Sequence, residues 1–162
     1  MKKLLPLILA LMMVLCLTPA VAAGVESCYD GVWVQFEDGF EIYVPADWLQ
    51  LELSESELAS GIFFSACSPD AAKLMQVGWA ALGTEMTIEE LHAALSTVFP
   101  YIELMEVNGI QLLCTADADS STLMFVGLDG VQPGYYSFLF YPMEDEELLA
   151  YAAVIASSLR NI

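Results

Sequence analysis

Short apolar runs, rich in β-branched and aromatic residues and bounded by turn-forming residues, follow one another along most of this 162-residue chain. Because the connections between the runs are short, neighbouring runs can pair only as antiparallel strands. Asn108-Gly109, between residues 101–107 and 110–116, is the strongest of the hairpin signals. The other strand candidates are residues 31–36, 40–45, 61–68, 74–82, 121–128 and 135–142. The pattern predicts a mostly antiparallel sheet.

The first two runs, GVWVQF and FEIYVP, also indicate how they pair. A two-residue turn would mix their polar and apolar faces. A three-residue loop over 37–39, with Gly39 in the left-handed region, places Phe36 opposite Phe40 instead. That register should be fixed because it gathers one wholly apolar face. The face then also contains Val32, Val34, Ile42 and Val44.

The segment VPADW ends the second run. Pro45 cannot donate a hydrogen bond to a strand ladder, so the strand should stop there. We expect Trp48 to fold back over the end of the sheet and to close the core rather than to line a binding site.

Two segments show a helical period instead of alternation. Residues 86–99 contain a capping box, Thr87 with Glu90, and an apolar stripe of Ile88, Leu91, Leu95 and Val98. Residues 143–160 begin with acids that suit the positive end of a helix dipole, and Arg160 is expected at the negative end. The apolar stripe of this second helix is Leu148, Ala152, Ile155 and Leu159.

Strands that are apolar on both faces need cover on both sides. We therefore predict an α+β fold, a mostly antiparallel sheet of about 6–8 strands with helices on both faces, which is an α/β/α sandwich.

The first residues follow the pattern of a secretory signal peptide, with Lys2 and Lys3, an apolar stretch and then small residues. We expect residues 1–23 to be cleaved, leaving 24–162 as a single secreted or extracytoplasmic domain. Lipid anchoring through Cys16 is not expected, because Leu15 precedes it where a small residue is required.

The charge is strongly negative, with 22 acidic residues against four basic ones and a net charge of −18. Residues 1–22 hold two of the lysines and no acid, so their removal gives 2 − 22 = −20. A surface this acidic repels nucleic acid and anionic membranes, and neither is expected as a partner. Solubility is the simplest explanation of the charge.

No motif in the sequence predicts catalysis, a cofactor or a metal centre. His92 is the only histidine, and the chain has no G-x-S-x-G element to go with it. Cys28, Cys67 and Cys114 have no second cysteine or histidine at metal-ligand spacing. They could form one disulfide and leave a spare thiol, or all stay reduced.

Residues 116–122, ADADSST, resemble a fragment of a calcium loop but lack its glycine and distal glutamate. Asp117 and Asp119 are therefore candidates for weak calcium binding, against the alternative of a plain hairpin loop.

Aromatic residues crowd the strands, and alternation directs some of them away from the main core. Trp33, Tyr43, Tyr135 and Tyr141 are the candidates for an interaction surface. The simpler explanation is that helices bury both faces of the sheet.

A strand ending in VPADW, a helix before a hairpin turning at VNG, and a C-terminal helix ending in IASSL together resemble the PsbP-like superfamily. The resemblance covers residues 31 to 162. That superfamily includes the extrinsic photosystem II subunit and many secreted bacterial proteins of unknown role. It implies a non-catalytic binding or assembly role and no catalytic residues, and nothing in the sequence indicates photosynthesis.

We expect a secreted, non-enzymatic binding or accessory domain of the cell envelope or extracellular space, with a protein or cell-envelope partner. One alternative is a secreted hydrolase that uses acidic residues with a serine or His92. Another is a carrier of a small apolar ligand. A cleft with converging carboxylates or His92 would favour the hydrolase, and an internal apolar pocket would favour the carrier.

Overall fold

The computed structural model describes residues 29–36 and 39–161. The predicted signal peptide, Cys16 and Cys28 lie outside these ranges. The described strands are β1 (Gly31–Gln35), β2 (Phe40–Pro45), β3 (Leu49–Gln50), β4 (Ile62–Cys67), β5 (Leu74–Ala81), β6 (Ile102–Val107), β7 (Ile110–Asp117), β8 (Thr122–Leu128), β9 (Gly134–Tyr141) and β10 (Arg160–Asn161). The described helices are α2 (Glu55–Ala59), α3 (Ile88–Leu95) and α4 (Glu146–Ser157).

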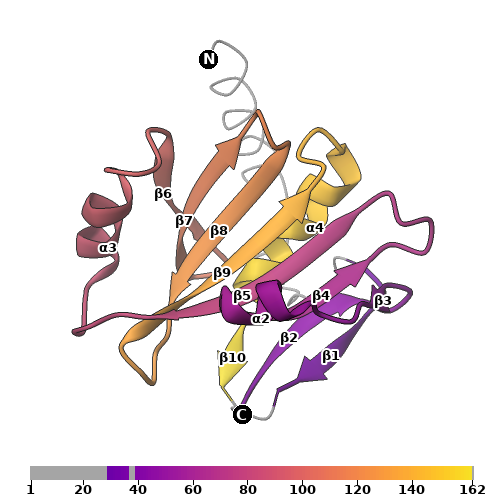
Figure 1. Ribbon diagram of the computed structural model, residues 1–162, viewed down its shortest axis with the longest axis horizontal. Helices are drawn as coiled ribbons and strands as arrows, with labels where there is room; N and C mark the ends of the chain where they lie inside the picture. The colour runs from indigo at the N-terminus through magenta and orange to yellow at the C-terminus, as the bar shows by residue number, and fades with distance from the viewer. Residues whose placement is uncertain (1–28, 37–38, 162) are drawn as a thin grey trace.

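The strands form two antiparallel sheets (Figure 1). The large sheet has seven strands in the order β3-β4-β5-β9-β8-β7-β6, and the small sheet has the order β1-β2-β10. The predicted α+β fold and antiparallel pairing are confirmed. The first hairpin does not extend the large sheet, because its apolar side chains pack onto the face of that sheet: Phe40 lies 5.0 Å from Tyr136, centroid to centroid.

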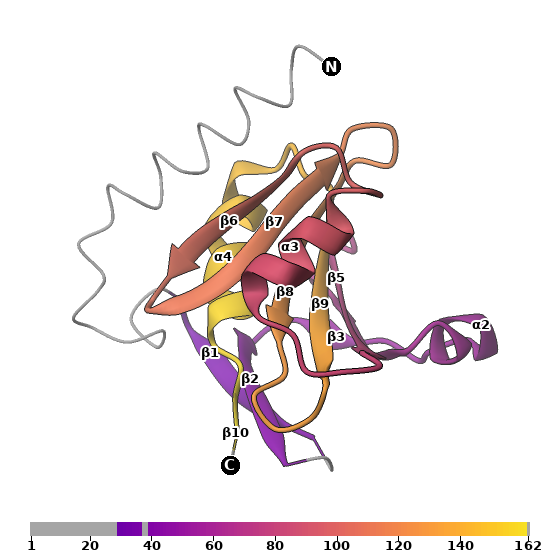
Figure 2. The ribbon, with the colours of Figure 1, turned by 90° about the vertical axis from the view of Figure 1, so that its left-hand side faces the viewer.

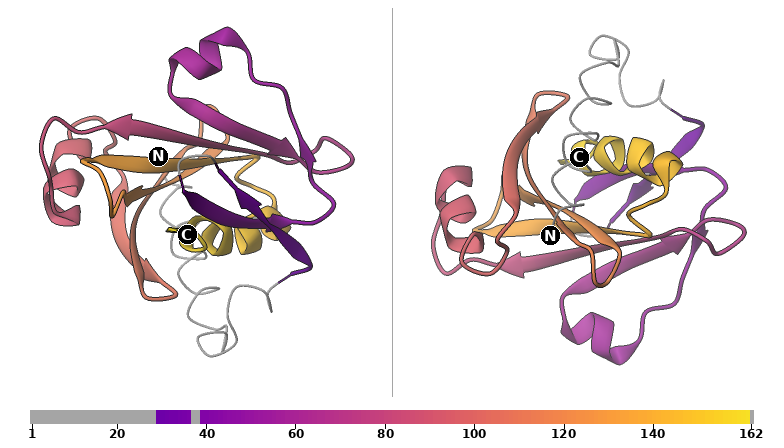
Figure 3. Two further views of the ribbon diagram at one scale, coloured as in Figure 1. Left: turned by 90° about the horizontal axis from the view of Figure 1, so that it is seen from below. Right: turned by 90° about the horizontal axis from the view of Figure 1, so that it is seen from above.

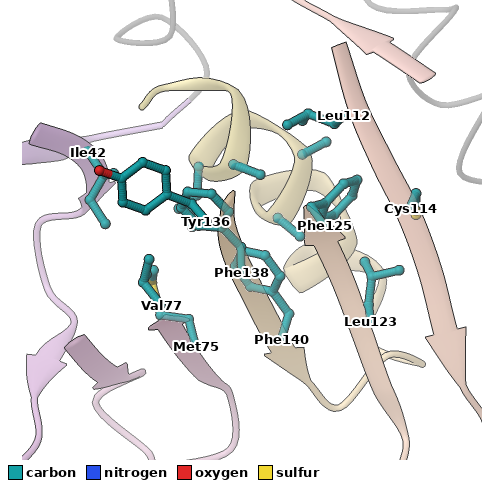
Figure 4. Packing of buried hydrophobic residues seen from close by; sticks show 14 of the residues in the cluster. Ile42, Met75, Val77, Leu112, Cys114, Leu123, Phe125, Tyr136, Phe138 and Phe140 are labelled. Atoms are coloured by element: carbon teal, nitrogen blue, oxygen red, sulfur yellow. The ribbon is translucent and has the colours of Figure 1, made fainter. Parts of the chain in front are cut away.

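Helices cover both faces of the large sheet, as predicted. The main core joins α4 and the small sheet to side chains such as Leu112 and Phe125. The second core joins α3 to Leu113 and Val126, the next residues along the same strands. Successive side chains of a strand point to opposite faces, so the two cores lie on opposite sides of the sheet. Figure 3 shows α4 and the small sheet together on one side, and Figure 4 shows the main core around α4.

The helices cover the two faces of the large sheet unequally. In β9 the buried residues Tyr136, Phe138 and Phe140 face α4. Of the alternate residues on the other face, Tyr135, Ser137 and Leu139 are only half-buried and Tyr141 is exposed. Helix α3 has eight residues and extends over about 12 Å, too short to cover a sheet of this width. The explanation that helices bury both faces therefore holds for the α4 face and only in part for the other.

The register predicted for the first hairpin is confirmed. Val34 pairs with Ile42 and Val32 pairs with Val44. The rings of Phe36 and Phe40 stack with centroids 4.6 Å apart, and Gly39 has φ +84°. Val32 remains exposed, unlike the rest of the predicted apolar face, because β1 is an edge strand of the small sheet.

Helix α3 begins as predicted but ends earlier. Thr87 and Glu90 form the capping box, with N–H to oxygen distances of 2.8 and 3.2 Å. The helix stops at Leu95, and Val98 is exposed instead of completing the buried stripe. The hydroxyls of Ser96 and Thr97 donate to backbone carbonyls of the last turn at 2.7 Å, which competes with continuation of the helix.

Helix α4 also ends before the predicted residue. Asp145 caps its start by accepting from the N–H of Leu148 at 2.8 Å. At its end the hydroxyl of Ser158 donates to the carbonyl of Ile155 and accepts from the N–H of Tyr43 in β2. Arg160 therefore lies in β10 and not at the negative end of the helix. None of the helices in the described ranges is long and apolar enough to cross a membrane.

Two elements near the start of the large sheet were not predicted. Strand β3 has two residues, and α2 has five and no buried side chain. Helix α2 projects away from the body of the molecule (Figure 2). A capping box of Ser54 and Glu57 begins it, and the side-chain amide of Gln76 donates to Glu57 at 2.6 Å, which ties it to β5.

Candidate functional site

A cleft of about 600 Å³ opens where the small sheet, the β4–β5 turn and the start of α4 meet. Four segments line it: residues 29–30, residues 45–48, residues 68–70 with Lys73, and Glu147 with Tyr151 of α4. We call it the acidic cleft, because four of its lining residues are Asp or Glu. Charged side chains and aromatic rings of the described residues line this one volume together, so we treat the cleft as the candidate functional site.

The VPADW segment forms one wall. Pro45 ends β2, and the N–H of Trp48 donates to its carbonyl at 3.2 Å, which closes a turn. The N–H of Ala46 donates to the carbonyl of Asp30 at 3.1 Å and holds the turn against the lead-in to β1. Trp48 is half-buried, packs against the main core and lines the cleft. It covers the core, as expected, and also forms a cleft wall, which was not expected.

The β4–β5 turn forms the opposite rim. The hydroxyl of Ser68 donates to Asp70 Oδ1 at 2.6 Å and accepts from the N–H of Lys73 at 3.0 Å. The N–H of Ala72 donates to the same Asp70 oxygen at 3.1 Å. These bonds, that of Ser68 first, lower the pKa of Asp70. Asp70 is therefore fixed in place and ionised at neutral pH.

Lys73 connects this turn to α4. Its ammonium lies 2.9 Å from Glu147 and 3.7 Å from Asp145, and its side chain is 14% exposed. The hydroxyl of Tyr151 donates to the other oxygen of Glu147 at 2.8 Å. The bond to Glu147 raises the pKa of Lys73, and the bonds from Lys73 and then Tyr151 lower the pKa of Glu147. Both groups are charged at neutral pH.

A stack of aromatic rings stands behind the cleft. Tyr29 meets Tyr151 edge-on at 5.0 Å and stacks on Tyr43 at 5.2 Å, and Tyr43 in turn lies 5.2 Å from Trp33. The Tyr29 hydroxyl donates to the carbonyl of Tyr43 at 2.6 Å. The stack fixes Tyr29 in the wall, and it leaves Tyr43 only 5% exposed.

The four aromatic residues considered for an interaction surface lie in separate places. Trp33 and Tyr43 are adjacent in the stack of the small sheet. Tyr135 and Tyr141 stand at opposite ends of β9, about 20 Å apart at the usual rise of a strand. Tyr135 packs against the second core, and Tyr141 is exposed. The structure does not bring the four side chains onto one surface.

Asp117 is the last residue of β7, and Asp119 lies in the β7–β8 turn. The N–H of Asp119 and the hydroxyl of Ser120 donate to the two oxygens of Asp117 at 3.0 and 2.8 Å. These bonds, that of Ser120 first, lower the pKa of Asp117. Such bonds also stabilise an ordinary hairpin loop. Within residues 29–36 and 39–161, no group of three or more His, Cys, Asp or Glu side chains is arranged so that it could hold a metal ion.

His92, Cys67 and Cys114 are not among the residues that line the acidic cleft. The Nε2 atom of His92 is 3.0 Å from the carbonyl oxygen of Ile102, so the side chain joins α3 to β6. Cys67 and Cys114 are buried and unbridged. Burial, with a smaller contribution from Glu103, raises the pKa of the Cys114 thiol to about 12.

A second, more apolar pocket of about 260 Å³ lies between the end of α4 and the large sheet. Leu112, Phe138 and Leu159 are among its lining residues. Sites for small organic ligands usually occupy about 300–1,000 Å³. This pocket is smaller than that range, whereas the acidic cleft falls within it.

No family model and no curated protein matches this chain. The solution structure of cyanobacterial PsbP (CyanoP) from Synechocystis sp. PCC 6803 is similar over 82% of this chain and 92% of that one, with a TM-score of 0.58 and 15% identity. A crystal structure from Bacteroides thetaiotaomicron VPI-5482 is similar over 76% of this chain, with a TM-score of 0.52 and 14% identity. This chain spans 45% of that second protein. The likeness confirms the PsbP-like fold predicted from the sequence.

Proposed function

We propose that this PsbP-like protein is a secreted, non-enzymatic accessory domain that binds a protein or cell-envelope partner through the acidic cleft. One observation carries the proposal: the aromatic rings of Tyr29, Trp48 and Tyr151 line the same cleft as four carboxylate side chains. Rings fixed by stacking offer contact area at little entropic cost, and carboxylates add directional acceptors. Binding sites commonly combine these two properties.

The electrostatics of two of the four cleft carboxyl groups, Asp70 and Glu147, favour binding over hydrolysis. Glycosidase chemistry needs one carboxyl group with a raised pKa to act as the acid. The pKa values of Asp70 and Glu147 are both lowered by local hydrogen bonds. His92, the other candidate for the hydrolase, bonds a backbone carbonyl elsewhere in the fold.

The place of action rests on the sequence. The pattern of residues 1–23 is that of a secretory signal peptide, and an acidic surface suits a protein that works in solution outside the cytoplasm. The resemblance to PsbP-like proteins likewise favours a binding or assembly role.

The test is site-specific photo-crosslinking in the envelope of the producing organism. A photoreactive residue replaces Ala46, which is exposed and lines the cleft, and in a matched control it replaces Val131, which is exposed in the β8–β9 loop. We expect a discrete crosslinked species from position 46 and not from position 131. Excess wild-type protein without the photoreactive residue should abolish the crosslinked species by competition. Excess Trp48→Ala protein should reduce its yield less.

Thermal denaturation of Trp48→Ala shows whether that competitor is folded at the assay temperature. Trp48→Phe, which keeps a ring in the wall, provides a second competitor and should compete nearly as well as the wild-type protein. Identical crosslinking from both positions, or none from position 46, would refute the proposal.

A further inference from the structure

We infer that the acidic cleft binds the ammonium or guanidinium group of a basic peptide segment in the partner protein. The inference rests on the proposed function and adds the chemistry of the ligand. The first argument is charge: Asp30, Asp47, Asp70 and Glu147 line the cleft against a single base, Lys73, so its lining carries 1 − 4 = −3. A cationic group gains Coulomb energy there, and an anionic one is repelled.

The cleft already holds one ammonium group. Lys73 lines it and pairs with Glu147 and Asp145, and its pKa is raised chiefly by the bond to Glu147. The charge of Lys73 is thus taken up by α4 and is not offered to an anionic ligand. The walls of the cleft stabilise a charged amine in this fold.

Two of the cleft carboxylates have no partner among the described residues. Asp30 and Asp47 are both exposed, and no hydrogen bond or ion pair within 29–36 and 39–161 engages their side chains. They flank the turn that carries Trp48, because the Ala46 N–H holds that turn to the Asp30 carbonyl. An incoming cation would therefore meet two unengaged carboxylates next to an aromatic ring.

The aromatic walls favour an organic cation. Ring faces attract ammonium and guanidinium groups, and the aliphatic stems of lysine and arginine pack along apolar surface. Tyr29, Trp48 and Tyr151 offer that surface in the cleft. A bare metal ion would make no use of the rings.

The same chemistry occurs elsewhere within the described part of this molecule. The guanidinium of Arg160 lies 3.6 Å from the ring centroid of Trp33 and bonds the carboxylate of Glu41 at 2.6 Å. Arg160 is thus held by a ring and a carboxylate together. The cleft presents the corresponding pair in Trp48 and Asp47, at neighbouring positions of one turn.

The test uses titration calorimetry of the protein comprising residues 24–162. The probes are hexalysine and hexaarginine, with hexaglutamate as the anionic control and chitohexaose as a neutral glycan. We expect both basic peptides to bind, with an affinity that falls as salt is added, and no binding of hexaglutamate.

A matched pair of double variants separates the cleft from the overall charge. Asp30→Asn with Asp47→Asn should weaken hexalysine binding by about tenfold, since it removes two carboxylates from the site. Glu85→Gln with Asp119→Asn changes the net charge equally, at exposed positions outside the cleft, and should leave binding nearly unchanged. All four side chains are exposed, so neither double variant should unfold the protein.

Equal losses in the two double variants would overturn the inference, because binding would then follow net charge alone. Binding of chitohexaose but of neither basic peptide would also overturn it, and would indicate a glycan site. If position 46 still crosslinks a partner while no basic peptide binds, the ligand inference fails and the proposed function stands. If neither occurs, both fail.

Discussion

The guanidinium of Arg160 bonds the carboxylate of Glu41, which lies 119 residues earlier in the chain, at 2.6 and 2.7 Å. Glu41 is only 4% exposed although it is ionisable. Its burial is compatible with charge because Arg160 supplies two charge-assisted hydrogen bonds. The pair joins β10 to β2 and completes the small sheet.

The first prediction is that Arg160→Ala lowers the free energy of unfolding by about 2–3 kcal/mol, since it leaves the buried Glu41 carboxylate with only the side-chain amide of Gln35, at 3.2 Å, as a partner. The expected cost lies at or below the lower end of the range for fully buried pairs, because Arg160 itself is 55% exposed. Urea denaturation at pH 7 measures it.

The control for this pair is the background Glu41→Gln, in which no charge is left buried. Arg160→Ala should cost much less in that background, giving a coupling energy in a double-mutant cycle. Equal costs in the two backgrounds would show that the pair contributes nothing specific.

The second prediction compares two glycines with similar backbone angles, Gly61 at φ +83° and Gly109 at φ +79°. A Cβ on Gly61 would lie 2.5 Å from the carbonyl oxygen of Trp79, whereas one on Gly109 would meet nothing within 4 Å. Gly109→Ala should cost about 1–2 kcal/mol from the left-handed conformation alone. Gly61→Ala should cost about 1–3 kcal/mol more, since the backbone must shift. Similar denaturation midpoints for the two variants would contradict this.

The third prediction concerns acid. The pKa of Glu147 is lowered from 4.5 by Lys73 and Tyr151, so its stabilising contribution is present above the unfolded pKa and is lost as pH falls through the folded value. Wild type should therefore be more stable than Glu147→Gln at pH 7, and the difference should shrink as pH falls below the unfolded pKa of 4.5 and vanish below the lowered pKa of the folded state. Urea denaturation at a series of pH values measures the difference.

Glu146→Gln is the matched control for the acid series. It changes the neighbouring residue in the same first turn of α4, and Glu146 is exposed. Its interaction with the helix dipole is similar, so the difference between the two variants isolates the bonds to Lys73 and Tyr151. A pH dependence that is the same in both would rule out a specific role for Glu147.

The fourth prediction concerns Cys114. Its pKa is raised to about 12 by burial, so very little of it is thiolate at pH 8 in the folded protein. We expect iodoacetamide to label Cys114 slowly in the native protein and rapidly in urea, as followed by peptide mass spectrometry. Fast labelling under native conditions would mean that the large sheet opens locally around β7.

The strand pairing could be predicted from the sequence wherever the faces differ. Phe40 and Ile42 alternate with more polar residues. A three-residue loop, unlike a two-residue turn, keeps them on one face with the apolar residues of the first strand, so the register could be predicted. The assignment of strands to two sheets could not be predicted. Strand β2 is buried along its whole length, and such a strand can sit beside another or on top of it.

The missed elements are short. Helix α2 carries a signature that was available, Ser54 followed by Glu57, but its five residues show no apolar stripe. Strands β3 and β10 have two residues each, too few for a period. Their formation depends on partners supplied by the folded chain.

The acidic cleft was beyond what a pattern can predict. Its walls come from four separate segments of the chain, and the one motif among them, VPADW, indicates the fold and not a cleft. Trp48 illustrates the difficulty. Its position just after a strand indicates that its ring covers the core, but the sequence does not show what lies on the other side of the ring. Only the tertiary structure brings Tyr151 and Glu147 into the same cleft as Trp48.

The pairing of β2 with β10 also has a consequence for the kinetics of folding. Contacts between residues this far apart in sequence are slow to form, because a long loop must close before they stabilise the chain. During synthesis β10 follows all the other strands, so one edge of β2 has no partner from its own chain until then. An unpaired edge is a template for other chains. Crowding of newly synthesised molecules should therefore favour aggregation through β2 until β10 docks.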